Sequence, residues 1–172
     1  IDICPVVQFA IPFLGLDERF SLETSHKGVC FGDSKSISTS YGYKLKLGSG
    51  EGILFNDKLQ GFRTYKDGLE ARVTKLIQEY LLKGVAIEAN SVIIDCGANV
   101  GDFYLALKRF GFDMDNCLYI GVEPEQKAFA CLSQNIKLGQ NQNLALWNED
   151  SFMDLYLTKD LASSSLIRPP GV

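Results

Sequence analysis

The chain has 172 residues, of which 46% are hydrophobic and 22% are charged, and 17 Lys and Arg against 21 Asp and Glu give a net charge of −4. This composition is typical of one ordinary globular domain and excludes a chain that is disordered over most of its length. The acidic balance argues against nucleic acid as a partner, because such binders cluster Lys and Arg on one face.

The cysteines and the longest apolar stretch limit the compartment and the membrane class. Five cysteines are scattered without a C-x-x-C pair, a pattern that favours a reducing, cytoplasmic location and predicts no metal site. The apolar stretch from Ile3 to Leu16 is interrupted by Pro5, Gln8 and Pro12. It falls short of the roughly 20 uninterrupted residues of a membrane-spanning helix. We therefore expect no membrane span.

The first 60 residues predict a small extension that contains a β-hairpin. Residues 1–40, which include the Ser-rich run 34–40, are interpreted as loop with short strands. Residues 43–47 then alternate apolar and basic side chains, a glycine-rich stretch follows over 48–52, and residues 53–55 are apolar. Alternation, glycine turn and a second apolar run are typical of a hairpin.

Residues 61–172 predict a second unit with alternating helices and strands. Asp67 and Glu70 form a helix-start signal, and Gly84 is the expected C-cap of that helix. The remaining expected elements are a strand over 91–95 buried on both faces, a helix over 103–110, a strand over 117–122, a helix over 125–138 capped by Gly139, a strand over 143–147 and a weak strand over 153–157. Strands that alternate with helices predict βαβ units and hence a parallel sheet of α/β class.

The candidate ligand-binding residues cluster at the turn between the strand over 91–95 and the helix over 103–110, which reads Asp95-Cys96-Gly97-Ala98-Asn99-Val100-Gly101-Asp102-Phe103. Ligands of open α/β sheets bind at the carboxyl ends of the strands, and Gly97 and Gly101 supply bare backbone there. Asp95 can accept hydrogen bonds from turn amides or a cationic group. Asn99 suits a left-handed backbone position.

A second acid ends the next predicted strand. Glu123 follows Gly101 at the offset of about 20 residues at which a carboxylate holds the two hydroxyls of a ribose. Pro124 then opens the following helix, where no N–H is needed. The turn and Glu123 together predict a nucleoside-bearing cofactor.

The turn also indicates which cofactor. A dinucleotide site has the pattern G-x-G-x-x-G with a free helix N-terminus for the pyrophosphate. Here the pattern is Gly97-x-x-x-Gly101, and Asp102 follows where that phosphate would lie. Asp95 and Asp102 instead suit a cationic ligand without phosphate, which favours S-adenosylmethionine over a nicotinamide dinucleotide.

Residues 93–103 resemble the first motif of class I methyltransferases in the D-x-G-A-N-x-G-D-F version of the FkbM-type family, and residues 122–124 resemble its second motif. The resemblance covers residues 60–167. It implies a Rossmann-like fold in which the turn of Asp95, Gly97, Ala98, Asn99 and Gly101 surrounds the methionine end of S-adenosylmethionine. It further implies that Glu123, next to Pro124, holds the ribose and that Ala145 and Leu146 lie near the adenine.

The same resemblance implies O-methylation of a hydroxyl on a sugar, a glycan or another small molecule. The family continues past the segment that Ser163-Ser164-Ser165-Leu166 resembles with a D-x-E-G element that is absent here, so we expect only the N-terminal half of the methyltransferase sheet. Two alternatives stay open, a nicotinamide-dependent oxidoreductase and a non-catalytic domain that keeps the fold for binding. No catalytic base is assigned, and His26, the single histidine, is interpreted as a surface residue.

Overall fold

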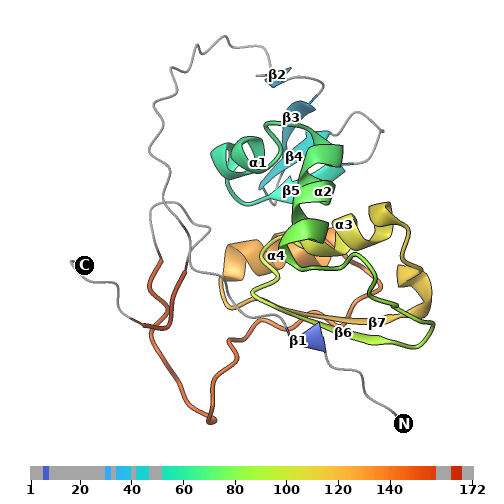
Figure 1. Cartoon of the computed structure of the whole chain (residues 1–172). Helices are drawn as coiled ribbons and strands as arrows, with labels where there is room; N and C mark the ends of the chain where they lie inside the picture. The colour runs from blue at the N-terminus through green and yellow to red at the C-terminus, as the bar shows by residue number, and fades with distance from the viewer. Residues whose placement is uncertain are drawn as a thin grey trace.

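The computed structural model describes residues 6–7, 30–31, 34–39, 42–46, 52–157 and 164–167, with the backbone alone for the first three ranges. Within these ranges the chain is a mixed α/β protein with two sheets and four α-helices (Figure 1). The elements are β1 (Val6–Val7), β2 (Cys30–Phe31), β3 (Ser34–Thr39), β4 (Gly42–Lys46), β5 (Gly52–Phe55), α1 (Lys58–Thr64), α2 (Leu69–Glu79), β6 (Val92–Cys96), α3 (Asp102–Phe110), the short 3-10 helix Met114–Asn116, β7 (Leu118–Val122) and α4 (Gln126–Asn135).

One sheet is parallel and has the order β1-β6-β7. Strand β7 pairs with β6 along its whole length, and α3 connects the two strands, so β6, α3 and β7 form the βαβ unit that the sequence predicts. On the other side β6 pairs with β1, which lies 85 or more residues earlier in the chain. The α/β class and the parallel sheet are thereby confirmed.

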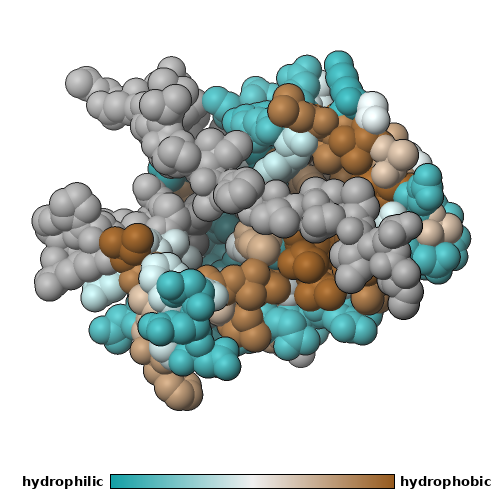
Figure 2. Space-filling model, turned by 60° about the horizontal axis from the view of Figure 1, so that its bottom comes forward, coloured by the Kyte–Doolittle hydropathy of each residue, from teal (hydrophilic) through white to brown (hydrophobic). Residues whose placement is uncertain are grey.

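Helices cover one face of this parallel sheet. The core between α2, α3, α4 and the sheet includes Ile93 of β6 and Tyr119 of β7. Ile94, the next residue of β6, points to the opposite face and is 41% exposed. The prediction of a strand buried on both faces is therefore wrong, because no described helix packs on this second side. Figure 2, which brings the bottom of Figure 1 forward, shows hydrophobic surface on this side.

The other sheet is antiparallel, with the order β2-β3-β4-β5. Its strands β4 and β5 form the predicted hairpin, in the register Leu45 opposite Ile53, and residues 47–51 between them lie outside the described residues. Residues 34–39 of the Ser-rich run form strand β3, which pairs with β4 over five residue pairs; the sequence predicts loop with short strands over residues 1–40 without placing a strand here.

The two sheets lie on opposite sides of helices α2, α3 and α4, and α1 lies beside the antiparallel sheet (Figure 1). A second core joins the hairpin and α1 to Val100 of the glycine turn and Cys131 of α4. Asn135 at the end of α4 accepts from Leu54 N (2.9 Å) and donates to Leu54 O (2.9 Å) and Val100 O (2.7 Å). These bonds fix the hairpin beside the glycine turn; the domain boundary at residue 60 stays a prediction.

Helices α2 and α4 end earlier than expected. The cap at Gly84 is wrong, because α2 ends at Glu79 with Tyr80 as its C-cap, and Leu81 already adopts a left-handed φ of 52°. The first residue of α2 follows Gly68, so Asp67 is not its N-cap. Gly139 is no cap of α4 either. It lies where an added Cβ would meet Ile136 Cγ2 at 3.0 Å, so it lets the chain pass close to the helix end.

The strand expected over residues 143–147 is wrong. The chain runs beside β7 earlier, where Gln142 forms a parallel bridge with Val122 and donates its N–H to Gly121 O at 2.8 Å. The side chain of Asn143 then donates to Glu123 O at 2.8 Å. The apolar residues that suggested a strand are exposed here, namely Leu144, Leu146 and Trp147.

The weak strand expected over residues 153–157 is also not formed. Tyr156 and Ser165 exchange two backbone hydrogen bonds of 2.9 and 3.0 Å as a single antiparallel bridge. Phe152, Met153 and Leu157 are exposed, so the alternation in this segment does not mark a buried face.

None of the helices in the described part of the chain has the length and apolar character needed to cross a membrane.

Candidate functional site

The loop between β6 and α3 forms a tight turn with three left-handed residues. Gly97 has a φ of 80°, Asn99 of 49° and Gly101 of 87°, which confirms the predicted backbone position of Asn99. The amides of Gly97 and Ala98 donate to Val122 O at 2.9 and 3.0 Å. The turn is thereby fixed to the carboxyl end of β7, the edge of the sheet at which α/β proteins bind ligands.

Glu123 connects this turn to the next one. Its Oε2 atom accepts from Asn99 N at 2.8 Å and its Oε1 atom accepts from Glu125 N at 2.8 Å. Burial raises the pKa of the Glu123 carboxyl, although these two backbone hydrogen bonds lower it in part. The turn and the acid that the sequence singles out are therefore direct neighbours, and the carboxylate cross-links the two strand ends.

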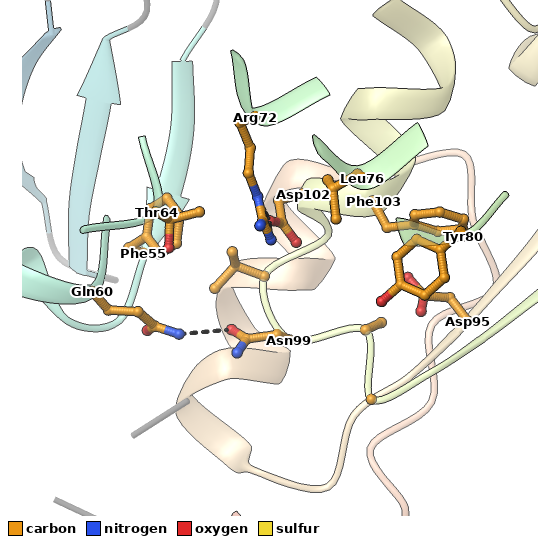
Figure 3. A pocket seen from close by; sticks show the side chains of 13 residues that line it. Phe55, Gln60, Thr64, Arg72, Leu76, Tyr80, Asp95, Asn99, Asp102 and Phe103 are labelled. Carbon is orange, nitrogen blue, oxygen red and sulfur yellow. Dashed lines mark hydrogen bonds and ion pairs between the residues drawn. The ribbon is translucent and has the colours of Figure 1, made fainter. Parts of the chain in front are cut away.

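A cavity of about 220 Å³ lies between the β6–α3 turn and helix α2 (Figure 3). Its walls come from three parts of the chain: the turn, helix α2 with its C-cap, and the hairpin with α1. The lining residues are Asp95, Gly97, Ala98, Asn99, Val100, Asp102 and Phe103 from the first part, Arg72, Leu76 and Tyr80 from the second, and Phe55, Gln60 and Thr64 from the third.

Asp95 is the most buried acid of the cavity wall, at 1% exposure. Its Oδ2 atom accepts a hydrogen bond from the hydroxyl of Tyr119 at 2.5 Å. Burial raises the pKa of Asp95 to about 7, the negative charges of Asp102 and Glu123 add to the rise, and the Tyr119 hydrogen bond opposes it. Within the described residues no basic side chain pairs with Asp95, so its charge is uncompensated.

Asp102 has a different environment. Its Oδ2 atom lies 2.5 Å from Arg72 Nη2 and 2.9 Å from Arg72 Nε (Figure 3). This corrects the sequence interpretation, which gave Asp102 to a cationic ligand and expected it to repel a phosphate. Arg72 already neutralises Asp102, so the cavity has one carboxylate, that of Asp95, left for a cationic group.

The two glycines of the turn serve different purposes. An added Cβ at Gly97 would meet no atom within 4 Å, whereas one at Gly101 would lie 2.6 Å from Ile136 Cδ1 and 3.0 Å from Leu132 Cδ1. Gly97 therefore leaves backbone open to a ligand. Gly101 lets α3 start close against α4, which is a packing role.

We expect Gly97→Ala to cost about 1–2 kcal/mol of unfolding free energy, from the left-handed backbone alone. Gly101→Ala has the same strain and also overpacks the buried side chains of α4, so it should cost about 1–3 kcal/mol more. Urea unfolding of both variants checks this order. Equal losses would show that the contact of Gly101 with α4 does not limit the side chain at this position.

The cavity contains four of the nine predicted cofactor-binding residues, namely Asp95, Gly97, Ala98 and Asn99. Gly101, Glu123 and Pro124 lie beside it in the two turns, Ala145 is half-buried, and Leu146 is 54% exposed. Their contacts with a cofactor stay predictions.

Five residues that the sequence interpretation missed lie in or directly behind the cavity: Gln60, Thr64, Arg72, Tyr80 and Tyr119. They come from α1, α2 and β7, at distances along the chain for which no local motif exists. Comparison of the chain with protein-family models, with curated proteins and with solved structures finds no match.

Proposed function

We propose that this chain is an S-adenosylmethionine-dependent methyltransferase with a Rossmann-like sheet, which methylates a hydroxyl of a sugar, a glycan or another small molecule. The observation that carries the proposal is the uncompensated carboxylate of Asp95 beside the open backbone of Gly97 in one cavity. The resemblance of residues 93–103 to the first FkbM-type motif supports it.

The charge of the cavity supports a cationic ligand. A buried carboxylate without a basic partner is costly, and a cation within hydrogen-bond distance of it removes that cost. S-adenosylmethionine has an ammonium and a sulfonium group and no phosphate. Because Arg72 is bonded to Asp102, the described cavity offers no unpaired basic side chain for a pyrophosphate, which disfavours a nicotinamide dinucleotide.

When bound, this cofactor supplies an activated methyl group on its sulfonium. The residues of the chain then have to position it, exclude water and hold the acceptor. Asp95 binds a positive group, Gly97 admits the ligand to the backbone, and Leu76 and Phe103 supply apolar wall. Correct orientation alone contributes about 7–11 kcal/mol to such transfers, so the proposed reaction does not depend on an assigned base.

Calorimetric titration of the chain with S-adenosylmethionine and, separately, with NAD tests the cofactor. We expect heat and a one-to-one stoichiometry with S-adenosylmethionine and none with NAD. The reverse result would establish the oxidoreductase alternative and end this proposal.

Transfer of a labelled methyl group to a panel of sugars and glycans tests the reaction. We expect labelled product that Asp95→Asn reduces. Cofactor binding without transfer to any hydroxyl compound would instead support the non-catalytic alternative. We also propose a cytoplasmic location, from the scattered cysteines of the sequence.

A further inference from the structure

Tyr119 does not line the cavity but contacts Asp95, the most buried acid of the cavity wall. In the register of the parallel sheet Tyr119 lies opposite Ile93, two residues before the partner of Asp95. Side chains two residues apart share a face of a sheet, so Tyr119 and Asp95 point the same way. The Tyr119 hydroxyl reaches Asp95 Oδ2 at 2.5 Å.

Burial of the Tyr119 hydroxyl limits the groups to which it can donate a hydrogen bond. Tyr119 is 1% exposed, and its ring packs edge-to-face on Tyr104 with centroids 5.0 Å apart. A buried hydroxyl needs a hydrogen-bond partner. Asp95 is that partner, and the ring contact prevents the hydroxyl from turning away.

The bond fixes one oxygen of a carboxylate that also lines the cavity. Figure 3 shows Asp95 facing Tyr80 at one end of this cavity. Because Oδ2 is bonded to Tyr119, the carboxyl group cannot rotate freely, and Oδ1 is the oxygen that Tyr119 leaves for another donor. A donated hydrogen bond also stabilises the charged form of a carboxylate more than its neutral form.

We propose that Tyr119 is a positioning residue, whose hydroxyl holds one oxygen of Asp95 so that the other is presented as a carboxylate to a cationic group of the ligand. The inference rests on the proposed function for the identity of that ligand, the ammonium or sulfonium of S-adenosylmethionine. The effect of the Tyr119 hydrogen bond on Asp95 can be measured without any ligand.

The other ionisable groups around Asp95 either disfavour its ionised form or are already paired with another group. Asp102 in the first turn of α3 and Glu123 after β7 are negative and raise its pKa. Tyr80 faces it from the end of α2, and its own pKa is raised by burial and by Asp95. Arg72 on α2 is bonded to Asp102. Within the described residues, Tyr119 is thus the one group shown to donate to this carboxylate.

The test is Tyr119→Phe, which removes the hydroxyl and keeps the ring. In the ligand-free protein, NMR titration of the Asp95 carboxyl carbon should show a midpoint at higher pH than in the unmodified chain. Calorimetry with S-adenosylmethionine between pH 6 and pH 9 should show affinity that rises with pH in both proteins. At pH 7 we expect a loss of about tenfold, the value of one hydrogen bond to a charged group, and a smaller loss at pH 9.

Tyr104→Phe is the matched control, because it removes a hydroxyl from the ring that packs on Tyr119 and leaves Asp95 untouched. Tyr104→Phe should change neither the NMR titration of Asp95 nor the pH dependence of the affinity for S-adenosylmethionine. A double-mutant cycle provides a second measurement: in an Asp95→Asn background, Tyr119→Phe should no longer alter cofactor affinity.

The outcomes separate the two proposals. An Asp95 midpoint that is unchanged in Tyr119→Phe overturns the positioning role, and so does an equal affinity loss in the Asp95→Asn background. A shifted midpoint in a chain that binds no S-adenosylmethionine supports the hold of Tyr119 on Asp95 and overturns the proposed cofactor alone.

Discussion

Asp95→Asn is expected to weaken S-adenosylmethionine binding about 10- to 100-fold while making the ligand-free protein more stable above pH 7. The affinity falls because Asn offers the cationic ligand a neutral acceptor in place of a carboxylate, and a hydrogen bond to a charged group contributes about 1.5–3 kcal/mol. The gain in stability follows from removing a carboxylate that is 1% exposed and has no basic partner among the described residues. Asn keeps an oxygen that can accept from Tyr119.

The sign of the pH dependence follows from the pKa of Asp95. Folding raises it from 3.8 to about 7, so the folded state holds this proton more tightly than the unfolded chain. The contribution of Asp95 to stability is therefore complete below the unfolded value and is lost as the pH rises through about 7. At about 1.4 kcal/mol per pKa unit the loss amounts to about 4 kcal/mol at most.

Urea unfolding at several pH values, together with calorimetry, measures both effects. The unfolding free energy of the unmodified chain should fall between pH 4 and pH 7, and that of Asp95→Asn should fall less. Asp150→Asn is the control, since Asp150 is exposed, and it should change neither quantity. If Asp95→Asn bound the cofactor as tightly as the unmodified chain, Asp95 would not be its ligand.

Glu123→Ala is expected to lower the unfolding free energy by about 2–4 kcal/mol, because it removes a buried acceptor of two backbone amides. The N–H groups of Asn99 and Glu125 would lose their partners, and the glycine turn would lose its connection to the segment after β7. Part of the loss is offset, because burial raises the pKa of Glu123 and its charge is costly in the folded state.

Chemical unfolding measures this loss, and titration with S-adenosylmethionine at a temperature where the variant is folded measures the effect on binding. Glu149→Ala removes an exposed acid and should leave both values unchanged. Unaltered stability in Glu123→Ala would contradict the cross-linking role. Unaltered affinity in the folded variant would contradict the predicted ribose contact.

The correspondence between sequence and structure is closest where local chemistry decides the conformation. The βαβ unit follows from a β-branched run, an amphipathic segment and a second apolar run, and the structure confirms it as β6, α3 and β7. Asn99 adopts the left-handed conformation that its side chain tolerates. Helix α3 ends at Phe110, where the predicted helix over 103–110 ends, and Gly111 follows it as a left-handed C-cap.

The predictions that failed depend on partners far along the chain. The apolar residues 144, 146 and 147 predicted a strand, but the backbone pairs with β7 at Gln142 and leaves them exposed. The sequence predicts loop with short strands over residues 1–40 but places no strand in the Ser-rich run, which has little β propensity and yet pairs with β4 as β3. In both cases a tertiary contact outweighs the local pattern, because strand pairing depends on what lies beside the segment.

The sequence by itself determined the α/β class, the glycine turn and the acid beside it, since these depend on spacing, side-chain type and the conformational freedom of glycine. Tertiary structure alone decided which charges remain available there. Arg72, 30 residues before Asp102, neutralises it, while Tyr119, 24 residues after Asp95, holds that carboxylate without neutralising it. Electrostatic interactions act over ångströms in space, and only the packing of α2 and β7 against the turn sets those distances.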